Sequence, residues 1–154
     1  MKTYSKVYIM VVFAVKYRLG LLNNDIRLQV YNAIQSISQN HGRGCRILGI
    51  GGTNSHIHIL FDLSPNISIA DYVREIKSRS SRWINENHLT LGRFAWQTGY
   101  GAFSYSQSSL STVMNYVANQ EEHHRHKTFK EELEMFFVRY DIVSDVRDMP
   151  HEPE

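Results

Sequence analysis

Cysteine, proline and long apolar runs are scarce in this 154-residue sequence, and each scarcity narrows the possible classes of protein. The single cysteine, Cys45, excludes an intrachain disulfide and suits a reducing compartment. Three prolines and 42% hydrophobic residues are typical of one globular domain. The apolar run 7–15 (VYIMVVFAV) is too short to cross a bilayer, and Lys16 follows it instead of a signal-peptide cleavage site. We therefore expect a cytoplasmic protein that does not interact with a membrane.

Acidic residues are scarce in the first two-thirds of the chain. Residues 1–100 contain twelve Lys and Arg but only five Asp and Glu, whereas residues 101–154 contain five and ten. An anionic partner would be attracted to the first region. A surface that is merely polarised would explain the same pattern.

Short β-branched runs and longer periodic segments alternate along the chain. The runs predict strands, and the segments with apolar residues three and four apart predict helices. The predicted strands are 7–15, 45–53, 55–62 and 100–105, and the predicted helices are 21–40, 67–87, 108–126 and 128–140. The acidic tail after Asp141 is expected to fray.

The order of these elements predicts an α+β fold. A β-α-β-β-α-β order forms an antiparallel ferredoxin-like sheet with both crossover helices on one face. The other face would stay open unless a later segment covered it. We expect residues 1–127 to form the main functional unit, and residues 128–154 to add a C-terminal helix and acidic tail to the same domain.

The predicted strand SHIHILFD carries two histidines on one face. Because strand side chains alternate, His56 and His58 point away from the face that carries Ile57 and Ile59. Their β-carbons would lie about 7 Å apart, two strand positions of about 3.4 Å each, so both rings could reach one ion. The alternative is a pair of histidines bonded to water on a half-exposed face.

The predicted helix 108–126 supplies a second pair of polar residues. Tyr116 and Gln120 are four residues apart and would share one helix face. Separately, each has an ordinary explanation, because tyrosine is often half-buried and glutamine is a common surface residue in helices.

Together, these motifs resemble a known family. A hydrophobic residue between two strand histidines, followed by Tyr-x-x-x-Gln on a later helix, resembles the single-tyrosine transposases of the histidine-hydrophobe-histidine (HUH) endonuclease superfamily, of the insertion-sequence 200/605 type. The similarity includes the branch of repeat-associated tyrosine transposases and covers most of the chain. The segments that carry it are GGTNSHIHILFDL, IADYVREIKSRSSRWI, FAWQTGYGAFSYS and NYVANQEEHHRHKTFKEE.

The resemblance implies metal-dependent cleavage and rejoining of single-stranded hairpin DNA. Tyr116 would be the nucleophile that forms a 5′-phosphotyrosine. The helper that takes its proton could be a water or His123, which lies seven residues further along the same helix face. His56, His58 and Gln120 would hold one Mg²⁺ or Mn²⁺. Three neutral ligands would leave the charge of the ion undiminished for polarising a phosphate oxygen. The resemblance also implies a homodimer in which the tyrosine helix completes its own site or the partner's site.

Basic residues on the predicted helix 67–87, with two more near the second predicted strand, are candidates for DNA contacts, because cationic side chains bind phosphates. An ordinary solvated surface would look the same in the sequence. The candidates are Arg43, Arg46, Arg74, Lys77, Arg79 and Arg82.

Three other functions remain open. The chain could be a domesticated, catalytically silent protein that only binds hairpin DNA. It could be a small metal-binding or metal-sensing protein that uses its eight histidines. It could also act in replication initiation or conjugative nicking, although such proteins usually carry added domains.

Overall fold

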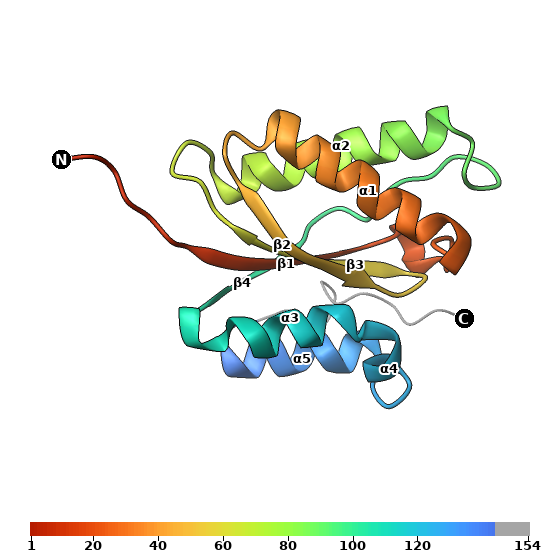
Figure 1. Ribbon diagram of the computed structural model, residues 1–154. Helices are drawn as coiled ribbons and strands as arrows, with labels where there is room; N and C mark the ends of the chain where they lie inside the picture. The colour runs from red at the N-terminus through yellow and green to blue at the C-terminus, as the bar shows by residue number, and fades with distance from the viewer. Residues whose placement is uncertain (144–154) are drawn as a thin grey trace.

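The computed structural model describes residues 1–143, in which a four-stranded sheet lies between two layers of helices (Figure 1). The predicted acidic tail therefore falls mostly outside the described residues. Within residues 1–143, no helix has the length and apolar character needed to cross a membrane. The elements in chain order are β1 (Tyr8–Ala14), η1 (Lys16–Arg18), α1 (Asn24–His41), β2 (Arg46–Gly52), β3 (His56–Asp62), α2 (Ile69–Glu86), β4 (Gly101–Tyr105), η2 (Gln107–Ser109), α3 (Leu110–Ala118), α4 (Gln120–His124) and α5 (Phe129–Arg139).

The strand order of the sheet is β2-β3-β1-β4, and each neighbouring pair is antiparallel. This is the order that two interleaved split β-α-β units produce, so the predicted ferredoxin-like α+β fold is confirmed. Strand β3 is central and pairs with β1 on one side and β2 on the other. His58 lies opposite Val12 of β1 and opposite Gly51 of β2.

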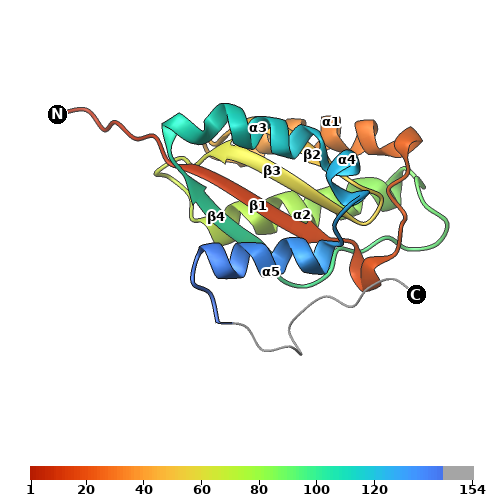
Figure 2. The ribbon, with the colours of Figure 1, turned by 90° about the horizontal axis from the view of Figure 1, so that it is seen from below.

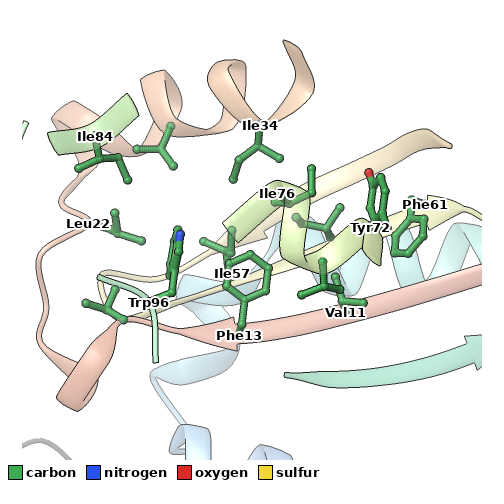
Figure 3. Close-up of a cluster of buried hydrophobic side chains, with 14 of the residues drawn as sticks. Val11, Phe13, Leu22, Ile34, Ile57, Phe61, Tyr72, Ile76, Ile84 and Trp96 are labelled. Atoms are coloured by element: carbon green, nitrogen blue, oxygen red, sulfur yellow. The ribbon is translucent and has the colours of Figure 1, made fainter. Parts of the chain in front are cut away.

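Helices α1 and α2 cover one face of the sheet with an apolar core (Figure 3). Ile57, Ile59 and Phe61 of β3 are fully buried there, as their alternation predicted. Phe61 stacks on Tyr72 of α2 at 4.3 Å between ring centroids. Burial of each such side chain stabilises the fold by about 1.5–3 kcal/mol.

Helices α3, α4 and α5 cover the other face, which was expected to stay open unless a later segment covered it (Figures 1 and 2). The physical reason is a second apolar cluster on that face of the sheet. Val113 and Val117 of α3 and Leu133 of α5 are buried in it. The strand and helix residues that complete its buried part are Met10, Val12, Ala14, Leu60, Phe103, Phe129 and Phe136.

The predicted helix 108–126 is broken at Asn119. Its φ of −107° and ψ of 34° lie outside the α-helical region, so α3 ends at Ala118 and α4 begins at Gln120. The side chain of Asn119 bonds back to the carbonyl oxygen of Asn115 at 2.8 Å. The tyrosine and the glutamine of the motif therefore stand on two successive helices.

Candidate active site

The central strand β3 places both histidines of the motif beneath the helices of the second face. His56 and His58 are fully buried, with ring centroids 5.3 Å apart. They are therefore not on a half-exposed face bonded to water. Backbone pairing on both sides of β3 fixes the positions from which the two rings project.

Each ring nitrogen of His56 has a different neighbour. Nδ1 lies 2.9 Å from the hydroxyl of Thr53, and Nε2 lies 3.3 Å from Oε1 of Gln120. Burial lowers the pKa of His56, and the charge of His58 lowers it further, so the ring is neutral at pH 7. If Nδ1 donates to Thr53, the lone pair of Nε2 points toward Gln120, as a cation ligand requires.

Gln120 is buried, and its side chain is held in one orientation. Its Nε2 donates to the carbonyl oxygen of Tyr116 at 3.0 Å, which directs Oε1 toward His56. The Tyr116 ring lies edge-on to His58, with centroids 5.6 Å apart. The structure thus brings the four motif residues together, while their chemical roles remain predictions.

Glycine in β2 permits this approach of α3. A β-carbon built on Gly51 would lie 1.7 Å from the carbonyl oxygen of Val117, so any other residue would push the helix away. A β-carbon built on Gly49 would approach only Cγ1 of Val117, at 3.9 Å. Helix α3 consequently rests directly on its own sheet, and Tyr116 meets His58 of the same chain.

Sequence reasoning missed Glu132 of α5, whose buried carboxylate lies at the centre of the site. Oε1 is 3.0 Å from Nε2 of His58 and 3.9 Å from Nε2 of His56. Oε2 accepts a hydrogen bond from the Tyr116 hydroxyl and lies 3.2 Å from Nε2 of His124. His124 is therefore also part of the site and was also missed.

The charges of Glu132 and Tyr116 are strongly coupled. Burial opposes the charged form of Glu132, but hydrogen bonds with His124 and His58 prevail and hold the pKa of its carboxyl well below the usual range. Burial raises the pKa of Tyr116, and the neighbouring charge of Glu132 raises it further. These protein groups alone therefore favour a carboxylate beside a neutral phenol.

His123, the predicted helper, also lies beside the tyrosine. Its ring centroid is 5.0 Å from that of Tyr116, and its Nε2 is 3.4 Å from Oε2 of Glu132. This nitrogen is buried, and no residue within 1–143 forms a hydrogen bond with it. Burial lowers the pKa of His123, which favours the neutral ring that could accept a proton.

The buried cluster fits a divalent cation. The nitrogen and oxygen atoms offered by His56, His58 and Glu132 lie within 4.8 Å of one another. Within the described chain, Nδ1 of His58 is buried without a hydrogen-bond partner, so Nε2 is the nitrogen of this ring that meets another donor of the cluster. Imidazole nitrogens with amide and carboxylate oxygens form a mixed donor set that first-row divalent cations accept.

The predicted DNA-contacting residues lie away from this cluster. Arg43 and Arg46 are exposed around the turn between α1 and β2, and α2 covers the sheet face opposite α3 (Figure 1). Arg82 of α2 lines an open pocket. The other basic side chains of α2 have partners within the chain, namely Arg74 with Asp71, Arg79 with Glu75, and Lys77 with the carbonyl oxygens of Gln97 and Gly99. A role in DNA binding stays a prediction for all six residues.

A ferredoxin-like sheet with paired strand histidines beside a helical tyrosine is the arrangement of a tyrosine transposase. The family model described as "Transposase IS200 like" matches residues 3–120, so the chain belongs to the IS200-like transposase family. This confirms the family that the motifs predicted. The chain is therefore a DNA strand transferase.

Individual relatives are similar at low sequence identity. The ISDra2 transposase TnpA of Deinococcus radiodurans is 21% identical over 114 residues, which cover 71% of this chain and 80% of the relative. A crystal structure of a transposase candidate from the same organism has a TM-score of 0.62 at 21% identity and covers 78% of this chain and 95% of its own. A REP-associated tyrosine transposase bound to a REP hairpin has a TM-score of 0.56 at 16% identity, with coverage of 97% and 78%. These structural similarities show a shared fold.

Proposed function

We propose that this transposase cleaves and rejoins single-stranded hairpin DNA through a 5′-phosphotyrosine on Tyr116, with Mg²⁺ or Mn²⁺ as cofactor. The observation that carries the proposal is the position of the Tyr116 hydroxyl, which lies in the same buried cluster as His56 and His58. Nucleophile and cation ligands must meet in this way for attack on a phosphate that the cation binds.

The side chains of the cluster have different roles in the proposed reaction. His56, His58 and Gln120 would hold the cation, which supplies positive charge to a phosphate oxygen when bound. Tyr116 loses its phenolic proton and its oxygen bonds to phosphorus, while the bond to the 3′ oxygen breaks and that oxygen takes up a proton. His123 is the helper that we propose to receive the phenolic proton, since burial lowers the pKa of its ring and its ring centroid lies 5.0 Å from that of Tyr116. Attack by a second 3′-hydroxyl reverses the step and rejoins the DNA.

A cavity beside the nucleophile could receive the strand. It has a volume of about 330 Å³, opens between α3 and α5, and is lined by Tyr116, Glu132 and the basic Arg139. The relative bound to a REP hairpin supports a hairpin substrate. We propose that Arg43, Arg46, Arg74, Lys77, Arg79 and Arg82 contact the hairpin away from the cleavage point.

The assembly and the location of the protein belong to the same proposal. We propose a homodimer that acts in the cytoplasm. Each chain contains a full set of candidate residues, so dimerisation is not needed to complete a site. Light scattering of the purified protein would test the dimer, and a monomeric mass would reject it.

A covalent-adduct assay tests the proposed function. The protein is incubated with end-labelled single-stranded hairpins and Mn²⁺ or EDTA, and a denaturing gel separates labelled protein from DNA. We expect a Mn²⁺-dependent labelled band that is lost in Tyr116→Phe. Tyr100→Phe, which changes an exposed tyrosine outside the site, should retain it.

The negative outcomes of this assay are informative. Hairpin binding without an adduct would reject the phosphotyrosine mechanism and favour the silent binding protein. An adduct that persists in Tyr116→Phe would assign the nucleophile to another residue.

A further inference from the structure

Glu132 is a deeply buried charged residue that the proposed chemistry does not yet use. Its exposed fraction is 1%, and α5, which carries it, lies beyond residues 3–120 matched by the family model. An isolated buried carboxylate is strongly unfavourable, so its position requires partners that stabilise the negative charge. Its two oxygens face different parts of the site.

The first oxygen faces the proposed cation ligands. Oε1 lies 3.0 Å from Nε2 of His58 and 3.9 Å from Nε2 of His56, which in turn is 3.3 Å from Oε1 of Gln120. Adjacent ligands at about 2.1 Å from one octahedral ion are about 3.0 Å apart, and opposite ligands are about 4.2 Å apart. These three separations lie between the two limits. The donor atoms of His56, His58 and Glu132 together span up to 4.8 Å, so they would have to draw slightly closer to surround one ion.

The second oxygen faces the nucleophile. Oε2 accepts the hydrogen bond of the Tyr116 hydroxyl and is also in contact with His124. A single carboxylate thus touches both the proposed cation site and the attacking group.

The position of Glu132 is fixed by the way α5 is anchored. Thr128 and Glu131 form a capping box at the start of the helix. Phe129 stacks on the ring of His56, with centroids 4.3 Å apart, and Leu133 is buried in the second apolar cluster. This anchoring holds the carboxylate in the site.

We infer that Glu132 is a fourth protein ligand of the cation, and that its second oxygen positions the Tyr116 hydroxyl beside the ion. The inference rests on the proposed cation site and revises one expectation about it. The ligand set is two histidines, one glutamine and one carboxylate, instead of three neutral groups. A carboxylate binds the ion more tightly and leaves less net positive charge to act on the phosphate.

Metal binding tests this inference without any DNA. Isothermal titration with Mn²⁺ compares the wild type, Glu132→Gln and the matched control Glu134→Gln, which removes the charge of an exposed glutamate two residues away. Loss of a supporting residue at a metal site typically weakens binding by about 10–100-fold, so loss of a charged ligand should weaken it by at least about tenfold. We expect that loss in Glu132→Gln and wild-type affinity in Glu134→Gln.

Two further measurements separate ligation from folding. The visible spectrum of bound Co²⁺ reports the ligand set directly and should change in Glu132→Gln but not in Glu134→Gln. Thermal unfolding of the metal-free proteins shows whether each variant is folded at the titration temperature. If Glu132→Gln is unfolded there, Glu132→Asp, which keeps the charge on a shorter side chain, replaces it and should show the same loss and spectral change.

The inference and the proposed function can fail separately. Wild-type Mn²⁺ affinity and an unchanged Co²⁺ spectrum in folded Glu132→Gln would overturn the inference, even if the wild type forms a DNA adduct. Weakened binding and a changed spectrum would support it, even if the wild type forms no adduct.

Discussion

The two faces of the sheet are both closed by helices, but they are built from different chemistry. Beneath α1 and α2, β3 contributes Ile57, Ile59 and Phe61 to an apolar core. Beneath α3, α4 and α5, the same strand contributes His56 and His58 to a buried polar cluster. Alternation along one strand therefore places apolar side chains alone on one face, and places the two histidines beside Leu60 on the other.

Buried polar groups also differ between the faces. On the α1–α2 face they include isolated pairs, such as Ser38 with Tyr72 at 2.7 Å and Trp96 with Ser80 at 2.9 Å, and a buried Arg27 at the edge that contacts Asn54 and Glu121. On the other face, several titratable side chains converge on the carboxylate of Glu132. Isolated pairs satisfy individual groups, whereas a connected cluster can bind an ion and move a proton.

The largest expected effect on stability comes from shortening a side chain in the apolar core beneath α1 and α2. Ile59→Ala should lower the free energy of unfolding by about 2–5 kcal/mol, and Ile59→Val by about 0.5–1.5 kcal/mol. Urea denaturation would measure both. Mn²⁺ affinity should remain at the wild-type value wherever the variants are folded. A folded Ile59→Ala that no longer binds Mn²⁺ would show that the two faces are not independent.

The next largest effect on stability comes from binding of Mn²⁺ to the buried polar cluster. Mn²⁺ at 100 times its dissociation constant should raise the free energy of unfolding by about 2.7 kcal/mol. The increase should nearly vanish in His58→Leu, which removes a proposed ligand, and persist in Ile59→Val. Thermal unfolding at fixed Mn²⁺ concentration checks this. An equal increase in His58→Leu would place the bound ion elsewhere.

A smaller effect comes from lifting α3 off the sheet. The β-carbon of Gly51→Ala would collide with the carbonyl oxygen of Val117, at a cost of about 1–3 kcal/mol in stability. The displaced helix carries Tyr116, so Mn²⁺-dependent adduct formation should also fall. Gly49→Ala, which meets nothing closer than 3.9 Å, is the control and should retain the activity. Equal activity in the two variants would mean that close contact between α3 and β2 is unnecessary.

The smallest expected effect on stability comes from removing a helix cap, and one cap from each face can be compared. Ser68 caps α2 and Thr128 caps α5, and replacement of either by alanine should reduce stability by about 1 kcal/mol. Only Thr128→Ala should also weaken Mn²⁺ binding, because α5 carries Glu132. Paired measurements of urea denaturation and Mn²⁺ titration would show this. Equal Mn²⁺ affinity in both variants would indicate that the start of α5 does not control the carboxylate.

The fold could be predicted because local patterns determine it. Apolar runs and amphipathic helices appear in the β-α-β-β-α-β order, and few topologies accommodate that order. The position of His56 and His58 opposite Ile57 also follows from strand alternation alone. The closure of the second face did not follow, because it depends on where helices late in the chain pack.

Part of the site could not be predicted from the sequence, because it also depends on how the late helices pack. The predicted helix 108–126 contains no proline, and the break at Asn119 accompanies the packing of α3 and α4 on the sheet. Glu132 stands in the acidic segment Lys-Glu-Glu-Leu-Glu, where a solvent-exposed position is the ordinary expectation. A usable signal did exist, since Glu132 is three residues after Phe129 and four before Phe136 and so lies on the apolar side of α5.

The central position of β3 has a consequence for how the site opens. Hydrogen exchange is slowest in strands paired on both sides, because their amides are released only when most of the structure unfolds. The two histidines proposed as ligands stand on such a strand, whereas Tyr116, Gln120 and Glu132 stand on helices that could detach at lower free energy. We therefore expect slow exchange at His56 and His58 and faster exchange across α3, α4 and α5. A DNA strand would then enter by transient lifting of the helices while the imidazoles keep their places.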